Sequence, residues 1–431
     1  MNNLTNKFNK TFFYYITFIF ITAVFWLYQK HNVGNDSTIS EWIINYQGGF
    51  TRRGFIGEIC FHIAAFFDLS LRYVIFLFQS FLYLIYSILI YFFIKNVPKN
   101  TLTIIAIFSP VFLLYPLAEA EVLARKEIFL YVGFIIFLNL STLKYSKNIP
   151  LIYIFFIFPL LCLIYEPFIF FFSYAIFVIL IQNSTDSIKK LILKILLSFS
   201  SSFVVLILIP LNPISIENHL LMANSLLNNF GEICYMSCAA LGDRTSVGVQ
   251  FYYVYTKVTF EVIFRYSIIL LVGFLPLLIL FFNSKLKIKL NLKKSPIIKW
   301  IISKNFLLII FILFMPSLIL FSAMGDWGRV VNMSYTFPIL IFIYLIKNNL
   351  ITVDNKISVF DDFYQNKRKI FIILFIIFAF GWNQKTALTG DVSTNSLYKI
   401  IYNTSKRVFE FDGIRLFQES PIIKFHKKYI E

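Results

Sequence analysis

Residues 41–58 read EWIINYQGGFTRRGFIGE and stand between two strongly apolar segments. The stretch holds two glutamates, the adjacent arginines Arg52 and Arg53, and four glycines, in a chain otherwise rich in Phe, Ile and Leu. Charged residues are costly inside a bilayer unless they are paired or functional. The stretch is therefore expected to be the first outward-facing loop of a polytopic membrane protein.

Composition excludes the soluble globular class. Of the 431 residues, 58% are hydrophobic, 19% aromatic and only 14% charged, whereas soluble domains are about 25% charged. Many apolar runs approach the roughly 20 residues that a helix needs to span a bilayer. The first run, 11–28, has no small-residue cleavage pattern after it and precedes many further runs, so it is expected to be a retained helix rather than a signal peptide.

The net charge of +17 is interpreted as a topology signal rather than as a nucleic-acid site. Most Lys and Arg residues lie in short segments between apolar runs, as the positive-inside rule predicts for cytoplasmic loops. The sequence therefore predicts an all-α polytopic membrane protein, one transmembrane domain over 1–431 with about 11 transmembrane helices. The predicted spans are 11–28, 71–94, 101–117, 128–143, 149–165, 166–182, 191–210, 260–282, 302–321, 333–346 and 370–383, with 55–69 as an interfacial or re-entrant helix.

The predicted topology has an internal check. Lys7 and Lys10 place the N-terminus inside, and lysine-rich, acid-poor runs then all fall inside. The segments that mix acids with arginine all fall outside, although only Lys and Arg counts set the sides. The predicted outward segments are 29–55, 118–127, 211–259, 322–332 and the C-terminal 384–431, and they are expected to build one shared site.

Arg52 and Arg53 are the first candidate ligand-binding residues. The guanidinium fork of arginine matches phosphate oxygens two at a time. The neighbouring Gly48, Gly49 and Gly54 permit close approach of the backbone. The pair is predicted to clamp a diphosphate head group, and the alternative is an interfacial anchor that binds lipid phosphates.

Glu41 and Glu58 are the candidate catalytic acids, because glycosyl transfer onto a hydroxyl needs a carboxylate as general base or acceptor partner. Asp36, just before the stretch, is a third candidate. For each of them the alternative is a solvated carboxylate without a catalytic role.

The segment 118–127, AEAEVLARKE, offers Arg125 and Lys126 as a second phosphate contact. If the segment is helical, Glu121 and Arg125 are four residues apart and could simply pair. Glu166 is a lone acid at the tip of an apolar hairpin, which makes it a candidate site residue or an interface-exposed glutamate.

Two outward segments share a Gly, Asp and Arg pattern. They are LGDRTS with Asp243 and Arg244, and GDWGR with Asp326 and Arg329. A carboxylate can hold an arginine fork in place for an anion, and Trp327 could stack on a sugar ring. The alternative for both is a local salt bridge that caps a turn.

Cys234 and Cys238 lie in an outward segment, where an oxidising compartment would permit a disulfide. Spacing of four residues on a regular helix is poor disulfide geometry, so the bond is left open. The four histidines have no zinc spacing, and metal ligation by histidine is not expected. No cofactor is predicted, and a divalent cation is left open.

Sequence motifs exclude several soluble enzyme classes. The chain lacks GxxxxGK[ST], GxGxxG and GxSxG, which argues against an ATPase, a dinucleotide enzyme and an α/β-hydrolase. No DxD pair lies in an outward segment. Because nucleotide sugars are cytoplasmic, an outward site implies a lipid-linked donor.

The helix number, the long first outward loop, the large later outward loop and the outer-face arginines and acids together resemble two related groups. One is the Wzy-type O-antigen and capsule polysaccharide polymerases, and the other is the GT-C-like polyprenyl-linked glycosyltransferases. The resemblance implies that Arg52, Arg53, Arg244 and Arg329 contact a diphosphate or glycan. It also implies that the acid is Glu41 or Glu58. The paired Asp of many GT-C first loops is absent.

These observations predict a multi-pass glycosyltransferase of the bacterial inner membrane, with a cytoplasmic N-terminus and a periplasmic C-terminus. It would polymerise polyprenyl-diphosphate-linked oligosaccharide repeat units on the periplasmic face, in surface-polysaccharide biogenesis. The expected partners are that lipid-linked glycan, membrane lipid and other polysaccharide-assembly proteins, and no nucleic acid. One alternative is a GT-C-like enzyme that adds a single sugar from a polyprenyl-phosphate donor. The other is a flippase or transporter, which would place ionisable residues deep within the spans.

Overall fold

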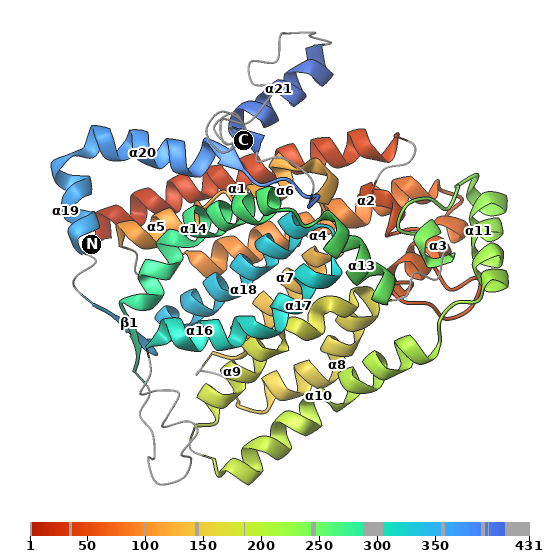
Figure 1. The fold of residues 1–431 in the computed structure, drawn as a ribbon, viewed down its shortest axis with the longest axis horizontal. Helices are drawn as coiled ribbons and strands as arrows, with labels where there is room; N and C mark the ends of the chain where they lie inside the picture. Colours follow the sequence, from red (N-terminus) through yellow and green to blue (C-terminus); the bar gives the residue numbers. More distant parts are fainter. Residues whose placement is uncertain are drawn as a thin grey trace.

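The computed structural model describes residues 2–33, 37–95, 97, 100–142, 146–184, 186–242, 247–287, 305–354, 358–388, 393–394 and 396–409. This part of the chain is mostly helical, and its long helices run side by side in one bundle (Figure 1). Two short strand pairs complete it.

The elements of the first half are α1 (Asn2–His31), α2 (Ser37–Ser40), α3 (Phe55–Phe66), α4 (Leu71–Ile94), α5 (Thr101–Ile107), α6 (Tyr115–Ala118), η1 (Ala120–Val122), α7 (Glu127–Leu140), α8 (Ile149–Ile164), η2 (Glu166–Phe171), α9 (Phe172–Gln182) and α10 (Ile188–Leu211). Those of the second half are α11 (Ile216–Phe230), α12 (Ala239–Gly242), α13 (Val247–Lys257), α14 (Phe260–Phe282), β1 (Ser284–Leu286), α16 (Phe306–Phe314), η3 (Met315–Ser317), α17 (Leu318–Ala323), α18 (Trp327–Lys347), β2 (Ile351–Val353), α19 (Ser358–Asn366), α20 (Arg368–Phe380), β3 (Trp382–Asn383), β4 (Ser393–Thr394) and α21 (Ser396–Phe409).

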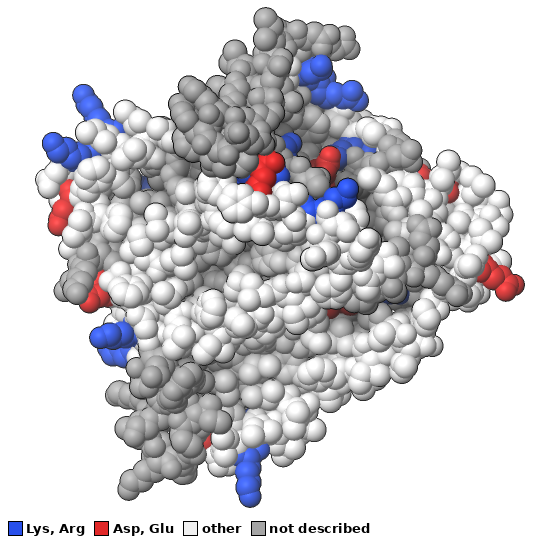
Figure 2. Space-filling model, in the orientation of Figure 1, with Lys and Arg blue, Asp and Glu red and all other residues white. Residues whose placement is uncertain are grey.

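Six helical stretches of the described chain are long and apolar enough to cross a membrane, as an all-α membrane protein requires. They are Lys7–His31, α4, α10, α14, Phe306–Ala323 and α18. The predicted count of about 11 spans is not confirmed, because α3, α7, α8 and Glu166–Gln182 are shorter apolar helices. Figure 2 shows a broad face almost without charged side chains, with the charges gathered near its margins.

Helix α18 is the centre of the bundle. In the most apolar stretch of α18, 89% of the residues are buried inside the protein. The corresponding share for α10 is 17%, so α10 lies at the periphery. The Phe337 ring on α18 stacks on Phe171 at a centroid distance of 4.4 Å and meets Phe134 of α7 edge-on at 4.8 Å. Aromatic packing between elements thus surrounds α18 with apolar side chains.

Several predicted helices are observed with the expected bounds because side-chain caps flank the apolar runs. The Ser70 hydroxyl accepts a hydrogen bond from the Tyr73 N–H at the start of α4, and Thr259 does the same for Val262 at the start of α14. The predicted spans 71–94 and 260–282 coincide with α4 and α14. The predicted interfacial helix 55–69 is the short helix α3.

The predicted span 101–117 is wrong as a single helix. Helix α5 ends at Ile107, and the chain turns before α6 begins at Tyr115. Pro110 lies in this turn and cannot donate a helical hydrogen bond. The Asn332 side-chain amide of α18 donates to the carbonyls of Val111 and Phe112 at 2.7 and 2.9 Å, which satisfies backbone that the break exposes.

The two ends of the bundle differ. The N-terminus, α19 and β1 lie at one end, and α2, α3 and α11 lie at the other (Figure 1). We call the second end the loop end. At the opposite end β1 and β2 pair antiparallel, with Ser284 opposite Val353. The predicted outward segment 211–259 carries three helices, α11 to α13.

Glycines in the opening stretch allow two close backbone approaches. A Cβ at Gly48 would lie 1.8 Å from the Asn218 carbonyl oxygen of α11, and one at Gly57 would lie 1.9 Å from the Ile44 carbonyl oxygen. Both positions leave no room for a side chain, since the obstructing atoms belong to the backbone. The stretch is therefore folded tightly on itself and against α11.

Gly57→Ala is expected to destabilise the protein by about 1–3 kcal/mol or more, because overpacking against a backbone carbonyl forces the chain to shift. The measurement is thermal unfolding of the detergent-solubilised protein, followed by tryptophan fluorescence. Gly231→Asn is the control, since Gly231 has a φ of +65° and open space around it, and Asn tolerates that conformation. Equal unfolding temperatures for the two variants would contradict the close-packed loop.

Candidate functional site

A cavity of about 480 Å³ lies between segments that are far apart in the sequence. Six of the predicted site residues line it: Glu41, Arg52, Arg53, Arg125, Asp326 and Arg329. The other lining residues are Ile44 of the first loop, residues of the segment before α12, of α12 and of α13, Ala323 to Gly325 at and after the end of α17, and Ala387 and Leu388. We call this the arginine cavity. It holds four arginines and two carboxylates on its walls.

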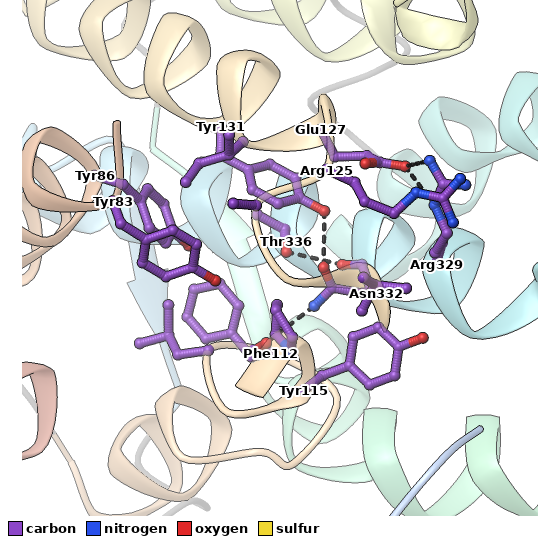
Figure 3. Close-up of a pocket in the computed structure, with 15 residues that line it drawn as sticks. Tyr83, Tyr86, Phe112, Tyr115, Arg125, Glu127, Tyr131, Arg329, Asn332 and Thr336 are labelled. Carbon is purple, nitrogen blue, oxygen red and sulfur yellow. Dashed lines mark hydrogen bonds and ion pairs between the residues drawn. The ribbon is translucent and has the colours of Figure 1, made fainter. Parts of the chain in front are cut away.

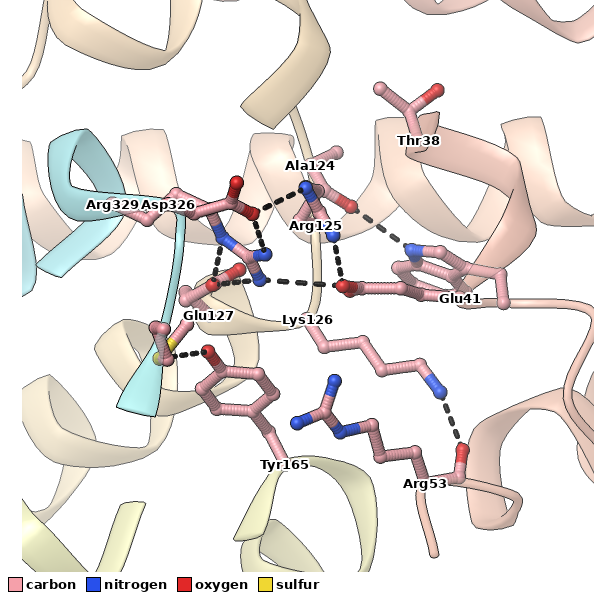
Figure 4. A network of polar contacts seen from close by, with 12 residues as sticks. Thr38, Glu41, Arg53, Ala124, Arg125, Lys126, Glu127, Tyr165, Asp326 and Arg329 are labelled. Atoms are coloured by element: carbon pink, nitrogen blue, oxygen red, sulfur yellow. Dashed lines mark hydrogen bonds and ion pairs between the residues drawn. The ribbon is translucent and has the colours of Figure 1, made fainter. Parts of the chain in front are cut away.

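A network of ion pairs joins three of these segments (Figure 4). Glu41 Oε1 accepts hydrogen bonds from Arg125 and, at 3.4 Å, from Arg329 Nη2. Asp326 Oδ2 accepts from Arg329 Nη1 at 2.9 Å and from Arg125 Nη1 at 3.3 Å. Each arginine thus bridges both carboxylates, which fixes the two guanidinium groups relative to one another.

Glu127 is a fifth member of this network and was not among the predicted site residues. It opens α7, where a negative charge is favourable, and its Oε1 accepts from Arg329 Nε at 2.6 Å. Arg329 lies in the first turn of α18, where a positive charge is unfavourable unless acids compensate it. Glu127 supplies part of that compensation. The sequence feature that could have predicted Glu127 as a site residue is its position beside Arg125 and Lys126 in one charged segment.

The backbone at Ala124 directs the neighbouring side chains. Ala124 has a φ of +50°, which is rare for a residue with a side chain. Its carbonyl accepts a hydrogen bond from the buried Trp42 indole at 3.1 Å and from Gln79 at 3.4 Å. The side chains of the next two residues point in different directions. Arg125 enters the ion-pair network, and Lys126 extends toward the backbone of Arg53 (Figure 4).

Arg53 and Arg52 differ in how firmly they are held. Arg53 makes a two-point contact with Glu166, with Nε to Oε2 at 2.8 Å and Nη2 to Oε1 at 2.7 Å. Its guanidinium also lies 5.0 Å from the centre of the Tyr165 ring. Arg52 reaches Glu166 only at 4.0 Å, and 34% of its side chain is exposed. Arg52 is therefore the cavity arginine that is freest to contact a ligand.

Arg53 has a strained backbone that its surroundings maintain. Its φ is +64°, in the left-handed region, and its carbonyl accepts a hydrogen bond from the buried Lys126 ammonium group. Lys126 therefore does not line the arginine cavity and is not placed as a phosphate contact. It positions the turn that carries Arg53. Glu166 likewise has a partner, Arg53, that lies 113 residues away in sequence.

Two buried groups near the cavity have shifted pKa values. Burial alone would raise the pKa of Glu41, but the positive charges of Arg125, Arg329 and Arg53 outweigh it and hold that pKa below its ordinary value. Glu41 therefore stays ionised and is a weak base. Burial lowers the pKa of Lys126 to about 7, against the opposing attraction of Glu41.

One oxygen of Glu41 is buried without a partner. Glu41 is fully buried, and its Oε2 has no hydrogen-bond partner among the described residues. Buried carboxylate oxygens are normally satisfied by a donor. Asp326 is the more accessible acid, since 34% of its side chain is exposed.

Glu58, the other predicted catalytic acid, does not line the arginine cavity. Its carboxylate accepts from the Tyr46 N–H at 2.7 Å and from the Gln47 amide at 2.8 Å, and it contacts the His62 ring at 2.8 Å. These contacts close the loop between residues 46 and 58. Its position thus fits a structural role in shaping the loop that presents Arg52.

Two predicted residues, Asp36 and Arg244, and with them Asp243, lie outside the described residues. Cys234 and Cys238 form a disulfide, with a Cα–Cα distance of 5.3 Å. The objection from helix geometry does not apply because the bond lies in an irregular segment after α11. His219 Nε2 lies 3.5 Å from Cys234 Sγ, so His219, Cys234 and Cys238 are the one cluster of potential metal-ligating side chains among the described residues, but the disulfide occupies both sulfurs.

A second, small cavity of about 30 Å³ shares Arg125 and Arg329 with the arginine cavity (Figure 3). Glu127, Tyr131 and Asn332 also line it. The Tyr131 hydroxyl donates to Asn332 Oδ1 at 2.8 Å. Aromatic and aliphatic side chains such as Phe112 and Ile128 form most of the remaining wall, so the network is backed by packed protein rather than by bulk solvent.

The pH dependence of stability is expected to reveal Lys126. Its folded pKa of about 7 lies below the value of about 10.4 for an unfolded lysine. Between these two pH values the unfolded chain binds more protons, so the contribution of Lys126 to stability rises with pH through this window. Lys126→Met cannot bind the proton. The unfolding temperature of the wild type should therefore rise relative to that of the variant between about pH 7 and about pH 10.

Lys189→Met is the matched comparison, because Lys189 has an exposed side chain at the start of α10. The difference in unfolding temperature between the wild type and Lys189→Met is expected to stay constant over the same pH range. A flat difference for Lys126→Met as well would contradict burial of the Lys126 ammonium group.

Comparisons with known proteins find no relative. A scan against protein-family models, a search of the curated proteins and a search of the solved structures each give no match. The functional conclusion therefore depends on the geometry and charge of the arginine cavity.

Proposed function

We propose that this protein is an integral membrane glycosyltransferase that joins polyprenyl-diphosphate-linked oligosaccharide repeat units. In this proposal it builds a bacterial surface polysaccharide on the periplasmic face of the inner membrane. The loop end is the periplasmic end, and the arginine cavity is the active site.

The observation that carries the proposal is the convergence of Arg52, Arg53, Arg125 and Arg329 on one cavity at the loop end of an apolar bundle. Fixed guanidinium groups bind phosphate oxygens and stabilise the charge that develops on a departing diphosphate. The acids that pair with these arginines hold them in position before the ligand arrives. Arg52, which has the weakest pairing, makes the first contact with the diphosphate.

Proton transfer is assigned to Asp326. The hydroxyl oxygen of the acceptor sugar attacks the anomeric carbon of the donor, and the bond from that carbon to the diphosphate oxygen breaks. The leaving group is the polyprenyl diphosphate, whose oxygen keeps the electron pair of the broken bond. The hydroxyl proton passes to Asp326. Both acids pair with Arg125 and Arg329, and Asp326 is favoured over Glu41 because 34% of its side chain is exposed, whereas Glu41 is buried. Glu41 holds Arg125 and Arg329 in position.

Residues on α13 complete the cavity with groups suited to a glycan. Gln250 and Tyr253 line it together with the arginines. An amide and a phenol offer both donors and acceptors for sugar hydroxyls. The ring of Tyr253 adds an apolar face on which a pyranose can rest.

Deletion of the gene in its host, followed by gel analysis of the lipopolysaccharide or capsule, separates the candidate functions. A polymerase mutant is expected to show a single repeat unit without a ladder. A full ladder that lacks one sugar would indicate a single-sugar transferase instead. Loss of all surface glycan with the lipid carrier retained on the cytoplasmic side would indicate a flippase.

Site variants test the proposed roles in the complemented deletion strain and in membranes supplied with lipid-linked repeat units. Arg52→Ala is expected to slow polymerisation about 10- to 100-fold, the effect of losing one charge-assisted hydrogen bond of about 1.5–3 kcal/mol. Asp326→Asn is expected to slow it about 100- to 10,000-fold, the usual contribution of a general base. Both variants should accumulate to the wild-type level, because both side chains are partly exposed.

Three comparisons sharpen this experiment. Arg368→Gln removes an exposed arginine of α20 that does not line the arginine cavity, and it should retain wild-type activity. Glu58→Gln separates the two acids of the opening stretch, since loss of turnover at a normal protein level would return the catalytic role to Glu58. Arg53→Ala should lower the protein level, because it leaves the Glu166 carboxylate with only the 4.0 Å contact to Arg52.

A further inference from the structure

Helix α21 carries exposed apolar side chains along one flank. Ile400 is buried, and the Arg407 side chain bonds to α1, so this pair, seven residues apart, marks the face turned toward the bundle. Ile401 and Val408 are the next residues, about 100° further round the helix. Their exposed fractions are 53% and 51%, and Phe409 at the helix end is 77% exposed.

The opposite flank of α21 is polar. Lys406 precedes Arg407 and so lies about 100° round the helix in the other direction. Lys406 is exposed, and the last turn holds the two basic residues Lys406 and Arg407. The helix therefore presents an apolar flank on one side of its contact with the bundle and, on the other side, a flank that carries the basic side chain of Lys406, which we call the basic flank.

Two hydrogen bonds fix the depth of α21 along α1. The Trp26 indole donates to Thr404 Oγ1 at 3.3 Å, and Arg407 Nε donates to Gln29 Oε1 at 2.9 Å. Trp26 and Gln29 lie in the last turns of the candidate span Lys7–His31. The end of a spanning helix lies at the boundary between acyl chains and head groups, where tryptophan is also enriched.

We infer that α21 is an interfacial membrane helix whose partner is the lipid bilayer. Ile401 and Val408 enter the acyl region, and the basic flank faces the phosphate head groups. An amphipathic helix with lysine and arginine on its polar side binds the interface in this way. The helix thereby anchors the C-terminal segment beside the rim of the bundle. This inference does not depend on the proposed glycosyltransferase activity.

The test uses the full chain in lipid nanodiscs that contain phosphatidylglycerol. Ile401→Cys, Val408→Cys and Lys406→Cys are each labelled with a nitroxide, and relaxation by oxygen is compared with relaxation by a water-soluble nickel complex. The oxygen-to-nickel ratio is expected to be severalfold higher at positions 401 and 408 than at 406, because oxygen concentrates in the acyl region. The unmutated chain is the labelling control, since Cys60 and Cys162 are buried and Cys234 is bonded to Cys238.

Two results would overturn the inference. Nickel access at 401 and 408 equal to that at 406 would place the apolar flank in water. Exclusion of both reagents from 401 and 408 would mean that another protein surface, such as a second copy of this chain, covers the flank. The three substitutions lie on exposed positions of one helix, so a folding defect would not mimic either result.

Discussion

Buried charges within an apolar bundle must be paired, and the rest of this structure depends on that constraint. Glu41, Arg125, Glu127 and Arg329 are all buried, and each is neutralised by another member of the same network. Removal of one partner from such a pair leaves an unpaired buried charge, at a cost of about 3–5 kcal/mol. The network therefore holds the first loop, the start of α7 and the start of α18 in one arrangement.

The same pairing shapes the arginine cavity. Arginines that bridge two carboxylates cannot collapse into the cavity or turn away from it, so their remaining donors stay at its wall. Arg52 and Asp326 are the exceptions, because each keeps about a third of its side chain exposed. A site with a fixed cationic frame and two accessible reactive groups suits an anionic substrate that must be held and then released.

Close backbone packing supports this frame. A Cβ at Gly328 would lie 2.2 Å from the Lys385 carbonyl oxygen. The Gly328 N–H donates to the Thr386 carbonyl at 3.1 Å. The segment after α20 is thus pressed against the first turn of α18, beside Arg329. Asn332, one turn further along α18, satisfies the carbonyls at the break between α5 and α6. Helix α18 therefore contributes both to the ion-pair network, through Arg329, and to the packing of the break between α5 and α6, through Asn332.

The amino-acid sequence by itself determined the helical class, the bounds of long apolar helices such as α4 and α14, and the polar segments that supply the cavity. Those features follow from apolar runs, capping residues and the cost of charge in a bilayer, all of which are local. Only the tertiary structure decided the roles of individual charges. Glu58 and Lys126 hold the loop, while Glu41 and Arg329 meet although 288 residues separate them. The disulfide between Cys234 and Cys238 likewise required an irregular segment that spacing could not reveal. Side chains on different segments acquire partners only when the chain folds, so pairing is a property of the packed bundle.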